Sequence, residues 1–246
     1  MIQKIDYLIK TINFTYYRIG ITLSLGVEVI FMRCKEDRLI ELLNKIDISI
    51  WGVSDITDLD VYNRKYIRAI SIGQAYSCSL KTYTPTGFHD FLFRDIKGNI
   101  DSNISIIEEF LKKENIEYHV VTNFVPDRNK CIGEFSNKFA AVRSGLGWIG
   151  KNTLLITPEY GPHVRLSTIF VNIELPITKK SREFKGCGDC TICKDICPKK
   201  CIKGVNWREG LSREDLIDIT ECKDRLGNKG NSICALCLVA CPIGRV

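Results

Sequence analysis

The chain has 246 residues, of which 45% are hydrophobic and 9% aromatic, and it carries a formal charge of +6 at pH 7. This composition excludes a disordered, collagen-like or low-complexity chain, and the length predicts one or two domains. The most apolar run, 19–32, is too short for a membrane-spanning helix and contains Glu28. The start of the chain lacks the pattern of a secretory signal, so we expect a cytoplasmic protein that does not associate with a membrane.

Helices and strands are expected to alternate through residues 1–178. Apolar side chains at helical spacing predict helices that include 39–46, 104–111 and 135–144, with Asp101 or Ser102 as the cap of the second helix. Runs rich in β-branched and aromatic residues predict strands at 66–72, 118–125, 153–157 and 164–173. The segment 83–87 is expected to be a loop, and 177–185 a polar linker. This alternation predicts a layered α/β domain.

Cysteines dominate the rest of the chain, because nine of the twelve lie between residues 187 and 241. One pattern occurs twice there, as Cys190-x2-Cys193-x3-Cys197-Pro and Cys234-x2-Cys237-x3-Cys241-Pro. Cys187 precedes the first copy by three residues, and Cys222 precedes the second by twelve. Where thiols are kept reduced, such a group predicts metal ligands rather than disulfides.

The spacing favours iron–sulfur clusters over zinc, the alternative. Structural zinc sites use two well-separated C-x2-C pairs. The run C-x2-C-x2-C-x3-C-P is that of bacterial ferredoxins, in which the fourth cysteine binds the other cluster. We therefore expect two 4Fe-4S clusters with crossed ligands. The first set is Cys187, Cys190, Cys193 and Cys241, and the second is Cys222, Cys234, Cys237 and Cys197.

Three further cysteines, Cys34, Cys78 and Cys201, are expected to be buried thiols with no ligand role. Each finished cluster carries a charge of about −2, so the basic excess of the chain is weak evidence for nucleic-acid binding.

The expected fold class is α+β. A layered α/β domain, residues 1–178, is followed by a small bacterial-ferredoxin-like domain with two 4Fe-4S clusters, residues 179–246. The second domain has too few apolar residues for a core of its own, and the clusters would supply the missing stability. A short helix is expected at 212–220, with Ser212 as its N-cap and Asp215 as the third residue of its first turn.

The residues of a glycine-rich segment, Gly145-x-Gly147-x-x-Gly150, match the dinucleotide-binding motif, but the expected secondary structure around them does not. That fold needs a strand before the glycines and a helix after them, and here the expected order is reversed. Two interpretations stay open. One is a turn that brings backbone close to a large ligand, and the other is a helix C-cap at Gly145 followed by a tight turn.

The run AAVRSGLGWIGKNTLLI at 140–156 resembles the signature of the epoxyqueuosine reductases. The run YGPHVRL at 160–166 and both cysteine groups follow in the order of that family. The resemblance implies a cytoplasmic protein with cobalamin and two 4Fe-4S clusters, which reduces the epoxide of a queuosine precursor in tRNA. It also implies that the corrin lies against Gly145, Gly147, Trp148, Gly150 and Lys151. Lys151 and Arg165 would contact phosphate groups of a cofactor tail, with ordinary ion pairs as the alternative.

The sequence departs from the family pattern at three places. Cys131 stands fourteen residues before Gly145, where the family has its catalytic aspartate. Cys131 and Asp127 are therefore the catalytic candidates, with Glu134 as a further acid and simple packing as the alternative for Cys131. The family's Asp-Tyr-His motif is Ala75-Tyr76-Ser77 here, and the helical-repeat region that follows the clusters in full-length members is not part of this sequence.

Three functions are consistent with these residues. The first is a cobalamin-dependent reductase that takes electrons from a ferredoxin or flavodoxin and acts on a small molecule or on tRNA. The second is a corrin-free, ferredoxin-like electron-transfer protein that serves a partner enzyme. The third is a structural or sensing role for the clusters.

Overall fold

The computed structural model describes residues 34–76, 88–121, 133–178, 184–224 and 234–244. Contacts divide the chain between Cys34 and Lys35, and every element named below belongs to the unit that begins at Lys35. The domain boundary that we expect at residue 178 lies inside this unit and stays a prediction. The run 19–32, Cys78 and the loop 83–87 lie outside the described residues. Among the helices that are described, none has the length and apolarity to cross a membrane.

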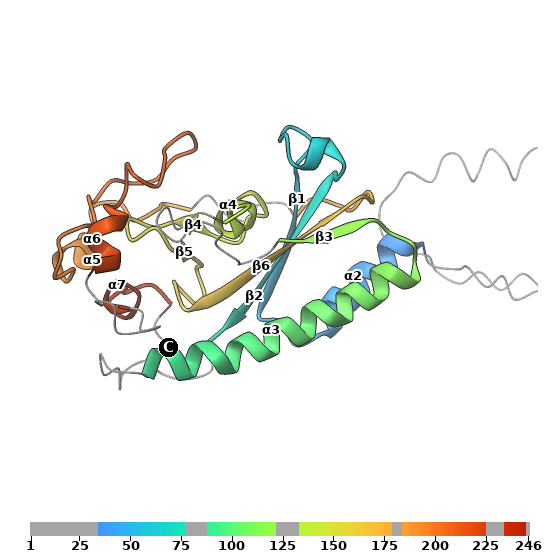
Figure 1. Cartoon of the computed structure of the whole chain (residues 1–246), viewed down its shortest axis with the longest axis horizontal. Helices are drawn as coiled ribbons and strands as arrows, with labels where there is room; N and C mark the ends of the chain where they lie inside the picture. The colour runs from blue at the N-terminus through green and yellow to red at the C-terminus, as the bar shows by residue number, and fades with distance from the viewer. Residues whose placement is uncertain (1–33, 77–87, 122–132, 179–183, 225–233, 245–246) are drawn as a thin grey trace, which may run out of the picture. The chain divides into compact units, whose positions relative to one another are not determined.

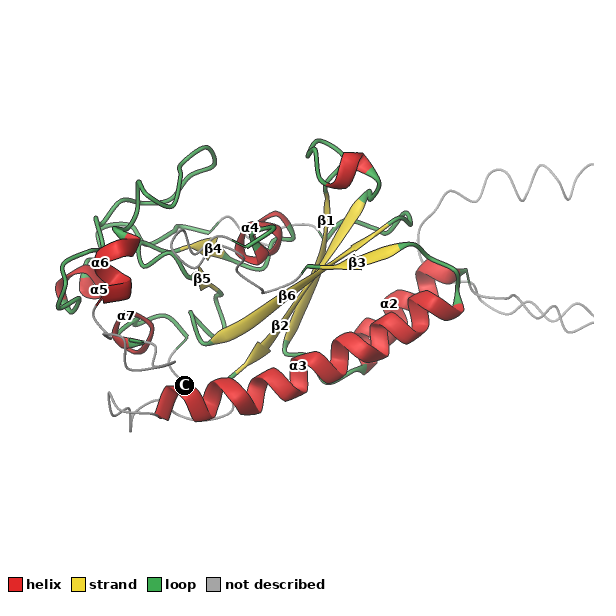
Figure 2. Ribbon diagram, in the orientation of Figure 1, coloured by secondary structure: helices red, strands yellow, loops and turns green. Residues whose placement is uncertain are grey.

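A four-stranded antiparallel sheet forms the centre of this unit (Figure 2). Its strand order is β1-β2-β6-β3, with bounds Ile50–Asp55, Arg68–Ala75, Val164–Val171 and Tyr118–Val120. Three of these strands are as predicted, to within a few residues at their ends. β1 was not predicted, because Gly52 and Ser54 interrupt its apolar run and hide the strand pattern.

Two helices, α2 (Lys35–Lys45) and α3 (Phe88–Lys113), pack against one face of the sheet (Figure 1). Alternate strand residues point to this face, and Ile70 and Ile169 are fully buried beneath the helices. Both helices were predicted. The predicted cap of α3 is wrong, because the helix begins at Phe88 and Asp101 and Ser102 lie in its middle.

A third helix, α4 (Asn137–Arg143), packs against the opposite face, as the run 135–144 predicted. Small residues let this helix approach the sheet closely. Ala140 and Ala141 are fully buried, and the Ser144 hydroxyl donates to the Ser71 hydroxyl at 3.2 Å. A Cβ atom on Gly52 would lie 2.8 Å from the Ser144 carbonyl oxygen, so the end of α4 rests directly on β1. This contact fixes the position of the glycine segment that follows α4.

The cysteine-rich part contains three short helices, α5 (Ile192–Asp195), α6 (Ile219–Asp224) and α7 (Leu236–Val239). The helix predicted at 212–220 is wrong. Ser212 and Asp215 do make the reciprocal contacts of a capping box, each accepting from the other's backbone N–H. However, Ile217 forms a β-bridge with Ile202, which ends the turn, and α6 begins only at Ile219.

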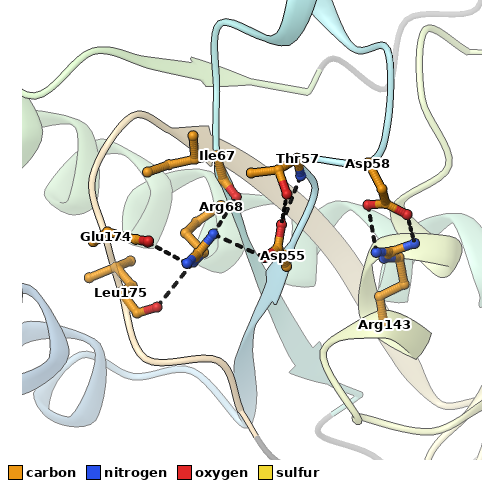
Figure 3. A network of polar contacts seen from close by, with 8 residues as sticks. All are labelled: Asp55, Thr57, Asp58, Ile67, Arg68, Arg143, Glu174 and Leu175. Carbon is orange, nitrogen blue, oxygen red and sulfur yellow. Dashed lines mark hydrogen bonds and ion pairs between the residues drawn. The ribbon is translucent and has the colours of Figure 1, made fainter.

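Arg68 joins three segments at one end of the sheet (Figure 3). Its side chain donates to the carbonyl oxygens of Leu175 at 3.1 Å and Ile67 at 2.9 Å. It also forms ion pairs with Asp55, at 3.4 Å, and with Glu174. Because only 8% of Arg68 is exposed, these partners compensate for removing its charge from water.

Replacing Arg68 by Met should therefore lower the free energy of unfolding by about 3 kcal/mol, because the buried carbonyls lose their donor and the carboxylates their cation. Urea unfolding measures this change. The control is Lys65→Met, which removes an exposed ion pair to Glu117 and should change stability little. Equal effects of the two substitutions would contradict a special role for Arg68.

Candidate metal centre

The chain leaves α4 through a helix C-cap at Gly145. Gly145 has a φ of 74°, and its N–H donates to the Val142 carbonyl at 3.0 Å. The N–H of Leu146 donates to the Ala141 carbonyl at 3.0 Å, which completes a Schellman motif. The C-cap interpretation of Gly145 is thus confirmed. The helix-first order of the segment also agrees with the exclusion of a dinucleotide-binding fold.

A small hairpin of β4 (Trp148–Ile149) and β5 (Leu155–Ile156) follows, where the sequence predicted only its second strand. Two glycines are needed for the packing of this hairpin itself. A Cβ atom on Gly147 would lie 2.1 Å from the Ile156 carbonyl oxygen, and one on Gly150 would lie 2.7 Å from the Ile156 side chain. The space beside both glycines is therefore filled by β5.

The tip of the hairpin contacts both cysteine-rich loops through two consecutive residues. Lys151 is only 5% exposed, and its Nζ donates to the carbonyl oxygens of Gly188 at 2.7 Å and Cys190 at 3.0 Å. The Asn152 side-chain amide donates to the Cys237 carbonyl oxygen at 3.1 Å. Sequence reasoning expected Lys151 to contact a cofactor phosphate and gave no signal for Asn152. The dipeptide holds the first cysteine loop with one side chain and the second with the other.

A second contact joins the turn after β5 to the last described residues of the chain. A Cβ atom on Gly161 would lie 1.9 Å from the Ile243 carbonyl oxygen, and one on Gly244 would lie 1.9 Å from the Gly161 nitrogen. Both glycines have positive φ, 56° and 68°. This close backbone packing holds the segment that follows Cys241 against the turn.

The first predicted ligand set gathers around α5. Cys193 lies in this helix, and the Cys190 N–H donates to the Cys187 carbonyl at 3.1 Å. Burial raises the pKa of Cys193 to about 11, and the neighbouring thiols of Cys187, Cys190 and Cys241 act in the same direction. Cys241, far along the chain, is therefore an electrostatic neighbour of Cys193.

The second predicted set lines an open pocket. Burial raises the pKa of Cys237 to about 12, and the thiols of Cys222 and Cys234 add to the shift, followed by those of Cys193 and Cys197. The two sets are thus adjacent. The pocket is lined by Cys197, Pro198, Lys199, Cys201, Ile202, Ile217, Cys222, Cys234, Leu236 and Cys237.

The donor chemistry of these thiols fits iron–sulfur clusters. Within the described ranges, no group of three or more Cys, His, Asp or Glu side chains converges closely enough to hold one metal ion. A zinc ion needs its ligands around a single point, whereas a 4Fe-4S cube takes one thiolate at each of four separated corners. Soft thiolates in two groups of four also match iron–sulfur chemistry.

The cysteines without an expected ligand role differ in position. Cys201 is 5% exposed, as predicted, and its Sγ lies 3.3 Å from the Sγ of Cys197. Burial works to raise the pKa of Cys197, but hydrogen bonds from Cys201 and from backbone amides outweigh it and lower that pKa. The prediction for Cys34 is wrong, because Cys34 is exposed just before the first turn of α2.

Comparison with known proteins agrees with the family resemblance. No family model matches the chain. A curated relative from Listeria monocytogenes is 38% identical over 190 residues, which are 72% of this chain and 48% of the relative. Its name is epoxyqueuosine reductase. A relative from Bacillus cereus, 35% identical over 122 residues, has the same name. The chain spans less than half of the length of these relatives.

Solved structures share the fold. A crystal structure of epoxyqueuosine reductase with an epoxyqueuosine-modified tRNA stem loop has a TM-score of 0.55 and 22% identity, over 85% of this chain and 64% of that one. A reductive dehalogenase, described as acting by B12-dependent dehalogenation, has a TM-score of 0.65 and 14% identity, over 85% of this chain and 32% of that one. At these identities the likeness concerns the fold alone.

The epoxyqueuosine reductase resemblance also implies site roles for Cys131 or Asp127, for Arg165 and for Trp148. Cys131 and Asp127 lie outside the described residues. Burial lowers the pKa of Arg165, and the nearby Tyr76 and Asp101 act in the opposite direction. The Trp148 ring packs against Phe184 with centroids 5.5 Å apart.

Cobalamin finds only partial support in the described residues. Trp148 Nε1 is buried without a hydrogen-bond partner among them, which leaves one donor for a ligand. Gly147 and Gly150 offer no open cradle, because β5 occupies the space beside them. The described residues therefore fit the clusters well. For cobalamin they offer one atom, the buried donor Trp148 Nε1.

Replacing Lys151 by Met should lower the free energy of unfolding by about 2 kcal/mol, because two carbonyl oxygens at a buried position lose their donor. Chemical unfolding of the cluster-loaded chain, kept without oxygen, measures this loss. Lys203 is a matched control, because its Nζ also donates to a backbone carbonyl, that of Glu214 at 2.7 Å, but at an exposed position. Lys203→Met should change stability little. A similar loss in both variants would contradict a special stabilising role for the contact of Lys151 with the first cysteine loop.

Proposed function

We propose that the chain is an iron–sulfur oxidoreductase related to epoxyqueuosine reductase. It passes single electrons through two 4Fe-4S clusters to an acceptor bound by the residues that precede the cysteines. The observation that carries this proposal is that each copy of the cysteine pattern lies close to a cysteine of the other, since Cys241 neighbours Cys193, and Cys197 neighbours Cys237. The curated relatives support the class of reaction.

The charge of Lys151 supports the clusters independently. Lys151 is 5% exposed, and its Nζ donates to neutral carbonyl oxygens of the first cysteine loop. Among the described residues, no carboxylate forms an ion pair with it. A buried charge is costly unless an opposite charge compensates it. A finished cluster of about −2 in the loop that Lys151 holds would supply that compensation.

The residues of this chain would have three tasks. The cysteine thiolates hold the iron, and the apolar side chains of Ile202, Ile217 and Leu236 keep water from the second site. Lys151 and Asn152 fix the two loops relative to each other and so fix the distance between the clusters. The clusters supply one-electron reduction and oxidation when bound.

Replacing Cys190 by Ala should remove one cluster and leave the other, because only the first set contains Cys190. The number of iron atoms per chain should fall from about eight to about four, and the number of acid-labile sulfides should fall in the same way. Cys34→Ala is the control, because Cys34 is exposed and lies outside both sets, and it should keep the full content. Unchanged iron in Cys190→Ala would contradict the ligand assignment.

The acceptor is proposed to be cobalamin. The B12-dependent chemistry of the dehalogenase with a similar fold and the buried Trp148 Nε1 support this choice. Cobalamin would supply a cobalt centre that accepts single electrons and reduces the substrate. The substrate is proposed to be an epoxide on tRNA or a small molecule, since a related structure holds a modified tRNA stem loop. A ferredoxin or flavodoxin in the cytoplasm would donate the electrons.

A corrin-free electron-transfer protein is the second candidate. The observation in its favour is that β5 already fills the space beside Gly147 and Gly150. In that case the chain would deliver electrons to a partner enzyme.

Gel filtration after incubation with cobalamin separates the two candidates. The cluster-loaded chain should elute with about one corrin per chain, visible by its absorbance, because the proposed acceptor is a resident cofactor. Trp148→Phe, which keeps an aromatic ring and removes the Nε1 donor, should retain less corrin. Complete loss of the corrin from the wild-type chain, with both clusters intact, would overturn the cobalamin proposal in favour of the second candidate. Clusters that cannot be reduced would favour a structural role.

A further inference from the structure

The second cluster site contains five thiols, one more than a cluster needs. A 4Fe-4S cube has four iron corners and takes four thiolates. The pocket at this site is lined by the four predicted ligands and also by Cys201. Cys201 and Cys197 are both buried, at 5% and 8% exposure, in one apolar cluster with Ile202 and Ile217. One of the five thiols is therefore surplus when the cluster is complete.

Cys197 and Cys201 compete for the same corner. Their sulfur atoms lie 3.3 Å apart, at hydrogen-bond distance. The iron–thiolate bonds of a cube diverge from its corners, so two sulfurs this close cannot serve two different irons. Either sulfur can reach the corner that the other occupies with a small shift.

The backbone between the two cysteines holds them together. The Lys200 N–H donates to the Cys197 carbonyl at 3.0 Å, and Lys200 has a φ of 52°, so the chain turns back toward Cys197. The Asp218 N–H donates to the Cys201 carbonyl at 2.9 Å, and the bridge between Ile202 and Ile217 follows. Cys201 is therefore fixed from both sides, with its sulfur directed at Cys197.

We propose that Cys201 is a reserve ligand of the second 4Fe-4S cluster. While Cys197 binds the iron, the Cys201 thiol donates a hydrogen bond to the Cys197 sulfur. When Cys197 cannot serve, the S–H bond of Cys201 breaks, its proton passes to solvent, and its sulfur bonds to the same iron without any transfer of electrons. The inference rests on the proposed function, because it requires the cluster.

The first cluster site offers a matched comparison. Cys241 occupies in the second copy of the pattern the position that Cys197 has in the first. Four residues beyond Cys241 the sequence has Arg245, where the first copy has Cys201. The corner bound by Cys241 thus lacks a reserve thiol at that position. Removing Cys197 and removing Cys241 should therefore have different consequences.

The test compares iron and acid-labile sulfide per chain after anaerobic cluster reconstitution. The wild-type chain and Cys197→Ala should both hold about eight iron atoms. The double variant Cys197→Ala/Cys201→Ala and the single variant Cys241→Ala should hold about half as many. A loss in Cys197→Ala equal to that of the double variant would overturn the inference while leaving the clusters of the wild-type chain in place. A wild-type chain without iron would overturn the proposed function as well.

The hydrogen bond has its own readout in the reduction potential of the second cluster, followed by electron paramagnetic resonance during a redox titration. A donor to a ligand sulfur stabilises the more negative, reduced cluster and raises the potential. Cys201→Ala should therefore lower the potential at full iron content. Cys201→Ser keeps a donor and should remain near the wild-type value. An unchanged potential in Cys201→Ala would contradict the hydrogen bond to Cys197.

Discussion

The contact of Lys151 and Asn152 with the two cysteine loops is the constraint on which the rest of the site depends. Lys151 holds the loop of Gly188 and Cys190, and Asn152 holds the loop of Cys237. The two residues are neighbours, so one hairpin tip sets the separation of two ligand groups that are far apart in the sequence. The hairpin is itself fixed by α4, whose end rests on Gly52 of the sheet. The sheet thereby positions the thiols through a short chain of close contacts.

Crossed ligation of the proposed clusters would act together with the contact of Lys151 and Asn152 with the two cysteine loops. If Cys197 and Cys241 each complete the other group, neither cluster can assemble without ordering both loops, which couples metal binding to folding. The packing of Gly161 against Gly244 fixes the segment after Cys241 in the same way. Such coupling explains how a segment with few apolar residues holds a defined structure. The same contacts place both cysteine loops beside the hairpin that carries Trp148, where we propose that the electrons are used.

Much of this could be predicted from local patterns, and the rest depends on contacts between distant residues. The helical spacing of Leu39 and Leu43 is a local signal that predicted α2 correctly, and the cysteine spacing is a local signal for the ligand groups, which stay a prediction. The helix at 212–220 failed although Ser212 and Asp215 make capping contacts, because the distant Ile202 pairs with Ile217. The role of Lys151 and the approach of Cys201 to Cys197 also had no sequence signal, since each is defined by where another segment lies.

We propose that the eight thiols hold two 4Fe-4S clusters in one folded unit. Native mass spectrometry of the wild-type chain, purified without oxygen, tests it most directly, because it measures the mass of the metal groups that remain bound. We expect a main species that carries the added mass of two 4Fe-4S clusters. A main species with zinc ions in place of iron and sulfide, or with a single cluster, would contradict it.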